Sequence, residues 1–441
     1  MLIAPVLFFL PLAVDPLLTG VSNAIINAYL ARAPRPEALI AGYGVAKNLL
    51  FMLFSSLMMV RQTVTTFTDG RESLAALKRF FAVVVLVNTV IVAGVAFTPL
   101  ADLVFGTLMG VRADALIHAK RVLRIFALFP LAVGFRHYWQ GVALRGHRSG
   151  IIAGAMAVRT TLLGVLVYVV LVPLTSTSAG AAWLFLGSVS VEGIVVVAFV
   201  LAGGIALLHR ADGEPVPAAR QILRFFLPLA VTALIRTAAL PIVNAGLARM
   251  NNPDLTLAGF TVGWEIGYIF FAPLMFFHHV PLEFLRRRDG ASTRRLAATA
   301  ALFAAVSSLF LGLLGFTAVG TWVLSRLVGV EGELLESARS VLRALVLLPP
   351  LYATREYFWG MLMHDRNTRP IWVSKSLSLI GLVGAVVLFT AIFSGHAAAG
   401  VAALLVSESI EVVLLAVNAR KRYRIGQRST ESGMGAGHDT A

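Results

Sequence analysis

The heptapeptide FFLPLAV stands at Phe8–Val14 and again at Phe225–Val231. The similarity continues from it at the same offset, without a gap through the next stretch of chain, and places Asn27 on Asn244. A second block recurs at nearly the same offset and places Arg136 on Arg355. Two homologous halves in one apolar chain are the usual construction of a secondary transporter, in which the substrate path lies between the halves.

The composition of the chain predicts a membrane protein. Hydrophobic residues make up 58% of the sequence and charged residues 13%, and the mean hydropathy is +0.84. A soluble domain carries roughly a quarter charged residues, so this chain has too few to cover a water-exposed surface. Apolar runs of about 20 residues are long enough to cross the hydrocarbon layer, and they must do so as helices. The chain has no cysteine, which excludes disulfides and thiolate metal sites.

Twelve membrane spans are expected, six in each half. They cover about 3–31, 37–60, 80–106, 115–144, 150–172, 180–207, 222–248, 255–285, 296–325, 335–363, 370–393 and 397–419. An even number per half gives both halves the same orientation, with a pseudo-twofold axis along the membrane normal. The expected domains are an N-lobe at 1–208, a cytoplasmic linker at 209–221, a C-lobe at 222–420, and a tail at 421–441 that is first basic and then disordered.

The basic residues predict the orientation of the spans. One set of alternate loops, from Arg61 after the second span to the tail after the twelfth, holds most of the Lys and Arg. Basic loops stay in the cytoplasm, so we expect both termini there and the chain in the cell (inner or plasma) membrane. Arg159 and Lys375 lie near the same ends of their spans, where snorkelling to the headgroups is expected. Much of the net charge of +15 follows from this topology, which weakens a nucleic-acid interpretation.

Two arginines lie deep in the expected spans. Arg136 in the fourth and Arg355 in the tenth each lie about nine residues, or roughly 13 Å along the helix, from the basic end. A charge at that depth usually faces a cavity, although a snorkelling side chain is the alternative. We expect the two guanidinium groups to come together at the pseudo-twofold axis and bind a carboxylate or phosphate. Tyr138 and Tyr357 recur beside them as further candidate substrate contacts.

Other charged residues within the spans extend the candidate substrate site. Lys47 and Glu265 lie on equivalent helices, the second and the eighth spans, and can pair across the cavity. Arg236 lies deep in the seventh span, and Asp15 is its near counterpart in the first. A simple structural pairing of these charges is the alternative for each.

Repeated amides and carboxylates form the remaining candidates. Asn27 and Asn244 are equivalent residues of the first and seventh spans, which bond either substrate or a neighbouring helix. Glu192 and Glu411 are equivalent in the sixth and twelfth spans, with Glu408 one turn before Glu411. These acids, with Asp15 and Glu265, either carry a coupling proton or balance the arginines.

The sequence offers no positive case for an enzyme. It contains no phosphate-binding glycine loop, no zinc-ligand spacing and no convincing nucleophile–base motif. We therefore expect no cofactor and no metal. The expected partners are a small anionic solute, the lipid bilayer, and a proton or sodium ion as the candidate coupling ion.

Several short patches resemble the progressive ankylosis (ANK) family, within the multidrug/oligosaccharidyl-lipid/polysaccharide (MOP) exporter superfamily. They are Ala41–Ala46 (AGYGVA), Pro241–Asn244 (PIVN), Leu123–Pro130 (LRIFALFP), Arg355–Met363 (REYFWGMLM) and Ser407–Ser409 (SES). The resemblance implies two six-helix lobes around a central cavity and export of pyrophosphate, ATP or citrate-like carboxylates. Arg136, Arg355 and Lys47 would then contact the anion.

Two other transporter classes remain as alternatives. The multidrug (MATE) branch has a similar layout, but its coupling aspartate would fall near Ile26 and Asn27, neither of which is acidic; Asp15 is the nearest substitute. A flippase of anionic lipid-linked precursors would also use cavity arginines. Such a flippase needs a lateral opening, and it often has two extra helices that this chain lacks.

Overall fold

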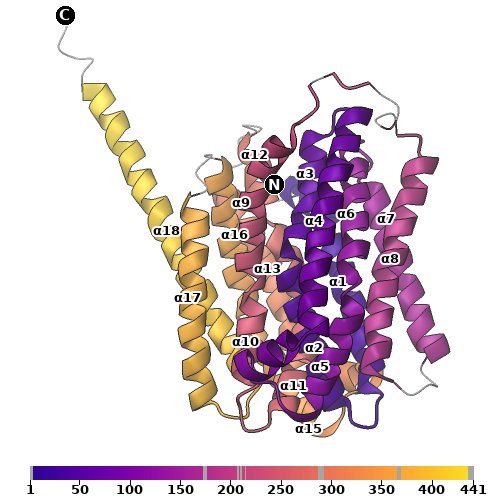
Figure 1. The fold of residues 1–441 in the computed structure, drawn as a ribbon. Coiled ribbons are helices and arrows are strands. Elements are labelled where there is room, and N and C mark those ends of the chain that lie inside the picture. The colour runs from indigo at the N-terminus through magenta and orange to yellow at the C-terminus, as the bar shows by residue number, and fades with distance from the viewer. Residues whose placement is uncertain are drawn as a thin grey trace, which may run out of the picture.

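In the computed structural model, residues 3–171, 176–205, 208, 211–213, 215–286, 293–364 and 369–435 are described, and they contain helices but no strand (Figure 1). The N-lobe comprises α1 (Ile3–Ala31), α2 (Pro36–Leu53), η1 (Ser55–Met59), α3 (Val60–Phe67), α4 (Arg71–Phe97), η2 (Asp102–Leu108), α5 (Ala113–Phe126), α6 (Phe129–Arg145), α7 (Gly150–Val165), η3 (Leu166–Leu171) and α8 (Ser178–Ala202). The C-lobe comprises α9 (Ala219–Thr237), α10 (Ala239–Leu247), α11 (Pro253–Phe271), η5 (Ala272–Phe276), α12 (His279–Arg286), α13 (Thr293–Phe316), α14 (Ala318–Trp322), η6 (Val323–Val328), α15 (Gly332–Leu345), α16 (Leu348–His364), α17 (Arg369–Ile392) and α18 (Ala398–Gly435).

The internal repeat extends to the limits of the helices. α5 and α6 have the same lengths as α15 and α16, and the offset between the two pairs is the one that places Arg136 on Arg355. The short 3₁₀ segments η1 and η5 are related by the offset of the two FFLPLAV copies and interrupt equivalent helices. The expected internal repeat and all-α fold are confirmed.

The spans are less regular than the sequence predicts. Among the described residues, nine helices are long and apolar enough to cross a membrane. α2, η1 and α3 together form one further candidate span, which is bent by 60°. This bent span continues to Phe67, beyond the end expected at residue 60. The expected fourth and tenth spans are each broken, into α5 with α6 and α15 with α16. A proline in the first turn of α6 and of α16 explains both breaks, because proline has no N–H to continue the preceding helix.

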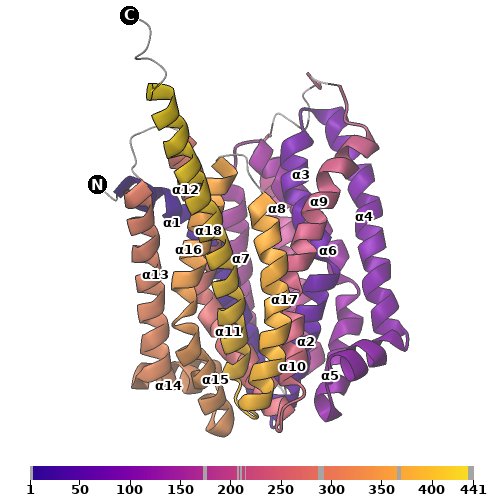
Figure 2. The ribbon, with the colours of Figure 1, turned by 90° about the vertical axis from the view of Figure 1, so that its left-hand side faces the viewer.

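Two helices cross between the lobes, and the FFLPLAV repeat lies at the crossing. The ring of Phe8 packs on Phe284 of α12 at 5.8 Å between centroids, and Phe225 packs on Phe67 of α3 at 5.3 Å. Figure 2 shows the start of α1 beside α12 and α13, and α9 beside α3 and α4. The two contacts are equivalent in the repeat, since the offset from Phe8 to Phe225 is also the offset from Phe67 to Phe284.

The next phenylalanine of each heptapeptide repeats this arrangement. Phe9 packs on Phe303 at 4.7 Å, and Phe226 packs on Phe81 at 5.6 Å. Phe81 and Phe303 lie on α4 and α13, which correspond in the repeat. Edge-to-face aromatic pairs of this kind add roughly 0.5–1.5 kcal/mol each beyond their buried area. Each heptapeptide therefore anchors one lobe to the other.

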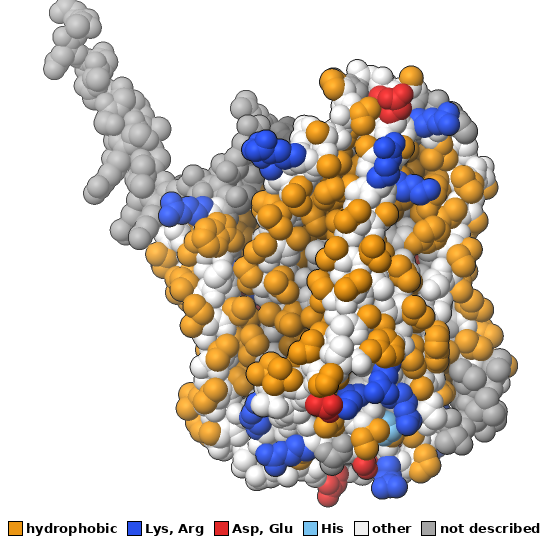
Figure 3. All heavy atoms as spheres, viewed as in Figure 1, with side chains coloured by type: hydrophobic (Ala, Val, Ile, Leu, Met, Phe, Trp, Pro, Cys, Tyr) orange, Lys and Arg blue, Asp and Glu red, His pale blue; other side chains and the backbone are white. Residues whose placement is uncertain are grey.

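The outer surface is that of a membrane protein. Figure 3 shows apolar side chains over the middle of one face, with Lys and Arg gathered towards its two ends. Large apolar residues such as Val83 and Leu227 are 61% and 54% exposed. This arrangement and the helical spans place the chain across a bilayer. α18 extends as a helix through Gly435, into the tail expected to be disordered, and residues 436–441 lie outside the described residues.

Candidate substrate site between the two lobes

The pseudo-twofold axis passes between α2 and α11. Gly44 and Thr261 are equivalent residues of the two repeats, and a Cβ added at Gly44 would overlap the Thr261 side chain. Equivalent residues of two halves meet only near the axis that relates them. The absence of a side chain at Gly44 therefore lets the lobes touch there.

The expected charge pair spans the two lobes one turn further along. Lys47 Nζ donates to Glu265 Oε1 at 2.5 Å, and both side chains are less than one tenth exposed. The pair joins α2 to α11 beside the axis. Lys47 is thus already engaged by a carboxylate, rather than free to bind an anion by itself.

Arg236, Asp15 and Tyr268 lie around this pair. Tyr268 of α11 is within electrostatic range of Glu265, Arg236 and Asp15, which brings helices of both lobes to one place. Arg236 is exposed and Asp15 partly exposed. Neither side chain forms an ion pair with another residue that the structure describes.

Arg61 adds a second unpaired cation, from the N-lobe. It lies in the first turn of α3, partly buried, within electrostatic range of Asp15 and Arg136. Its guanidinium makes no hydrogen bond to any described residue. We expected Arg61 in a cytoplasmic loop; α3 instead continues the expected second span beyond the bend at η1, and Arg61 lies in its first turn. Its repeat partner, His278, was the sequence signal that could have marked this position.

A buried cluster of polar residues surrounds Glu192 in the N-lobe. Arg136 and Arg159 both donate to Glu192 Oε2, at 2.8 and 3.0 Å, and Gln140 donates to Oε1 at 2.9 Å. His137 lies 2.9 Å from the second Arg136 nitrogen. We call these five residues the N-cluster. Arg159 was expected to snorkel but is 3% exposed, because Glu192 holds it inside the bundle.

The C-lobe contains the corresponding C-cluster, formed by Arg355, Glu356, Lys375, Glu408 and Glu411. Arg355 donates to Glu408 at 2.5 Å and to Glu356 at 2.7 Å. Lys375 donates to Glu411 at 2.9 Å and to Glu408 at 3.2 Å, so it is buried and does not snorkel. His278 of the preceding segment lies 2.5 Å from Glu356 Oε2.

These clusters correct the expected anion site. Arg136 interacts with N-lobe groups and Arg355 with C-lobe groups, so the two guanidinium groups do not form one joint site. Arg136 instead shares Glu192 with Arg159, and Arg355 bonds Glu356 and Glu408, each within its own lobe. The sequence could not reveal this, because Glu192 and Glu408 are contributed by other helices, far from the arginines along the chain.

The repeated tyrosines, Tyr138 and Tyr357, each bond a backbone carbonyl of a neighbouring helix. Tyr138 donates to the Leu74 carbonyl at 2.9 Å, and Tyr357 donates to the Thr293 carbonyl at 3.2 Å. The two acceptors are themselves equivalent, since they are related by the same offset as the two tyrosines. These hydroxyls connect α6 to α4 and α16 to α13, and this shared structural contact explains why the repeat retains both.

Asn27 and Asn244 are 1% exposed, and neither amide has a hydrogen-bond partner among the described residues. Buried amides normally find a partner, so these two are distinctive polar positions on α1 and α10. No group of three or more His, Cys, Asp or Glu in the described chain could hold a metal ion. The residues near the axis, Lys47, Arg61, Arg236, Asp15 and Glu265, comprise three cations and two anions.

A model of the progressive ankylosis protein (ANKH) matches residues 214–423. No curated protein matches the chain in sequence. Among solved structures, an inward-facing multidrug resistance MATE family transporter of the MOP superfamily is 16% identical over 93% of this chain and 96% of its own, with a TM-score of 0.68. The lipid II flippase MurJ in an inward closed conformation is 11% identical over 91% and 86%, with a TM-score of 0.67.

A third structure is a MOP superfamily transporter from Pyrococcus furiosus, described as having a binding pocket of reverse polarity. It is 16% identical over 95% of each chain, with a TM-score of 0.60. At these identities the structures establish the fold, which is that of a MOP/MATE-type transporter. Residues 214–423 therefore resemble the progressive ankylosis protein, and the fold as a whole resembles that of MOP superfamily transporters.

Proposed function

We propose that this transporter moves a small anionic solute, of the pyrophosphate, nucleotide or carboxylate kind, by alternating access of its two lobes. The carrying observation is the pair of unpaired arginines, Arg61 and Arg236, each contributed by a different lobe. A guanidinium binds phosphate or carboxylate through two parallel hydrogen bonds. Neither guanidinium is hydrogen-bonded to a carboxylate of the described chain, although Glu356 lies within electrostatic range of Arg236 and Asp15 within range of Arg61, so this capacity remains for a ligand.

The charges around the two arginines support an anion further. The N-cluster has two guanidinium groups against one carboxylate, and Arg136 lies within electrostatic range of Arg61. An excess positive charge on the N-lobe attracts an anion and repels a cationic drug. The multidrug alternative would instead need acids without partners, and of the acids near the axis only Asp15 fits.

The lobe contacts suggest how access alternates. Gly44 and Thr261 join the lobes at the axis, and the Lys47–Glu265 pair lies beside them. The two FFLPLAV segments, in α1 and α9, form a second set of contacts between the lobes. We propose that these two sets of contacts open in turn, so that Arg61 and Arg236 face one side of the membrane and then the other. A proton or sodium ion is the proposed coupling ion, with Asp15 as the unpaired acid nearest the site.

Flux into proteoliposomes tests the proposal. Labelled pyrophosphate, ATP and citrate are compared with a cationic dye, for the parent chain and for Arg61→Gln and Arg236→Gln. Loss of a charge-assisted contact should lower anion affinity about tenfold to hundredfold in each variant. Arg236→Lys should recover only part of the loss, because an ammonium group lacks the planar fork.

Arg148→Gln is the control, since Arg148 is an exposed arginine between α6 and α7, outside the site. It should transport like the parent. Dye transport with no anion flux in the parent chain would establish the multidrug alternative instead. Unchanged anion flux in both Arg61→Gln and Arg236→Gln would remove these two residues from the site.

A further inference from the structure

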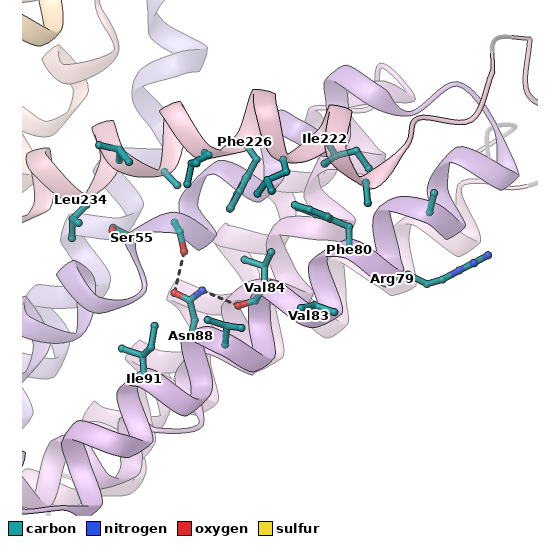
Figure 4. Close-up of a pocket in the computed structure, with 18 of the residues that line it drawn as sticks. Ser55, Arg79, Phe80, Val83, Val84, Asn88, Ile91, Ile222, Phe226 and Leu234 are labelled. Atoms are coloured by element: carbon teal, nitrogen blue, oxygen red, sulfur yellow. Dashed lines mark hydrogen bonds between the residues drawn. The ribbon is translucent and has the colours of Figure 1, made fainter.

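A long apolar groove lies between α4 of the N-lobe and α9, the first helix of the C-lobe (Figure 4). Its volume is about 860 Å³. α4 lines one side with residues such as Val83, Val84 and Val87, and α9 lines the other with residues such as Leu223 and Leu227. Val83, Val87 and Leu227 are 61%, 50% and 54% exposed, so the groove opens on the outer surface of the bundle. In a membrane, that surface faces lipid.

Almost all of the groove lining is apolar, and two of its few polar side chains, Ser56 and Asn88, bond each other. Ser56 donates to Asn88 Oδ1 at 3.0 Å, and Asn88 Nδ2 donates to the Val84 carbonyl at 2.8 Å; Figure 4 shows both bonds. A water molecule needs two to four polar partners to be held in a cavity. The occupant of this groove must therefore be apolar, and hydrocarbon chains are what surrounds it.

The length of the groove fits one leaflet. Along α4 its lining runs from Ala76 to Ile91, and the part from Arg79 to Ile91 is about 18 Å of helix at 1.5 Å per residue. One leaflet contributes about 15 Å of a hydrocarbon core of about 30 Å. A single acyl chain lying along the helices thus fills the groove from the headgroup level to the middle of the bilayer.

Charge identifies the headgroup. Arg79 is the one charged side chain among the described lining residues, and Figure 4 shows it at the end of the groove, directed away from the apolar lining. Arg220 and Arg224 are exposed in the first two turns of α9, whose early residues line the same end. Basic residues at headgroup level attract anionic lipids. A guanidinium also binds a phosphate oxygen pair bidentately.

We propose that this groove is a binding site for an anionic phospholipid, with one acyl chain between α4 and α9 and the headgroup phosphate on Arg79. The repeat supplies a contrast. At the corresponding positions of α13, Arg79 is replaced by Ala298 and Asn88 by Ser307. The site therefore belongs to one side of the transporter, and the two lobes differ in how they meet lipid.

Photocrosslinking in liposomes tests the site. The parent chain is reconstituted with phosphatidylglycerol or phosphatidylcholine that carries a diazirine on one acyl chain, and crosslinked peptides are mapped by mass spectrometry. We expect phosphatidylglycerol to label α4 and α9 peptides several-fold more than α13 peptides. Val84→Trp should fill the groove and remove this labelling, whereas Val306→Trp, at an exposed valine of α13, should leave it unchanged.

Arg79→Gln should reduce the preference for phosphatidylglycerol over phosphatidylcholine at least threefold while labelling by the acyl chain persists. Equal melting temperatures of the three variants show that folding is intact; for a variant that melts early, labelling per folded molecule is compared instead. Equal labelling of α4 and α13 in the parent, or undiminished labelling in Val84→Trp, would overturn the site. An unaltered lipid preference in Arg79→Gln would overturn its assignment to anionic lipid. If two copies of the chain associate at this face instead, the parent should form a dimer that Val84→Trp abolishes. That result would overturn the assignment of the groove to lipid.

Discussion

The N-cluster and the C-cluster occupy the same place in the two repeats but have opposite charge balances. Two cations face one carboxylate in the N-cluster, whereas two cations face three carboxylates in the C-cluster. The difference comes from two positions. His137 stands where the C-lobe has Glu356, and Val189 stands where it has Glu408.

Hydrogen bonding follows the same division. Arg136 Nε, Arg159 Nε and Gln140 Oε1 are buried without a partner, whereas every buried side-chain polar atom of the C-cluster has one among the described residues. Duplication has thus retained the backbone scaffold while the buried charges of the halves have diverged. The N-lobe carries both this excess positive charge and Arg61. We therefore expect the N-lobe to contribute most to the attraction of an anion.

The largest expected effect comes from removing the carboxylate of the N-cluster. Glu192 alone compensates two buried guanidinium groups, so Glu192→Gln should lower the free energy of unfolding by about 3–5 kcal/mol. Glu411→Gln is the matched change in the C-cluster. It should cost less than half as much, because Lys375 keeps Glu408 at 3.2 Å. Thermal unfolding of both variants in detergent measures the difference, and equal losses would refute the contrast between the clusters.

A smaller effect is expected where the two lobes meet. A double-mutant cycle with Lys47→Met and Glu265→Gln should give a coupling energy of about 1–3 kcal/mol, since the two groups touch and are buried. Either single change leaves an uncompensated charge and should be worse than the pair together. Unfolding of the three variants provides the cycle. Simple additivity would show that the lobes are not linked through this pair.

The smallest effect is expected for the feature that the lobes share. Tyr138→Phe and Tyr357→Phe each remove one hydroxyl-to-carbonyl hydrogen bond, at a cost of about 0.5–1.5 kcal/mol. The two losses should agree with each other, and anion affinity in flux measurements should stay at the parent value. A large loss of affinity in either variant would restore that tyrosine to the substrate site.

Several features followed from the sequence because they depend on local pattern or on the repeat. The apolar runs predicted membrane helices, and the two copies of FFLPLAV predicted the repeat that helix limits now confirm. The Lys47–Glu265 pair was also expected, since equivalent helices of a two-fold arrangement must meet near its axis. The family resemblance rested on short patches and is supported by the match at residues 214–423.

Only the tertiary structure decided which charges remain available. In the sequence, Arg136 and Arg355 had the pattern of a pair of ligand arginines. In the structure, helices α8 and α18 bring Glu192 and Glu408 into contact with them. Arg61 was expected in a loop, but it lies in α3, which continues the helix after the bend at η1. Apolar periodicity and internal symmetry are properties of the linear sequence, so they can be predicted from it. Ion pairing between helices depends on their rotation and depth, which packing sets between segments that lie far apart in the sequence.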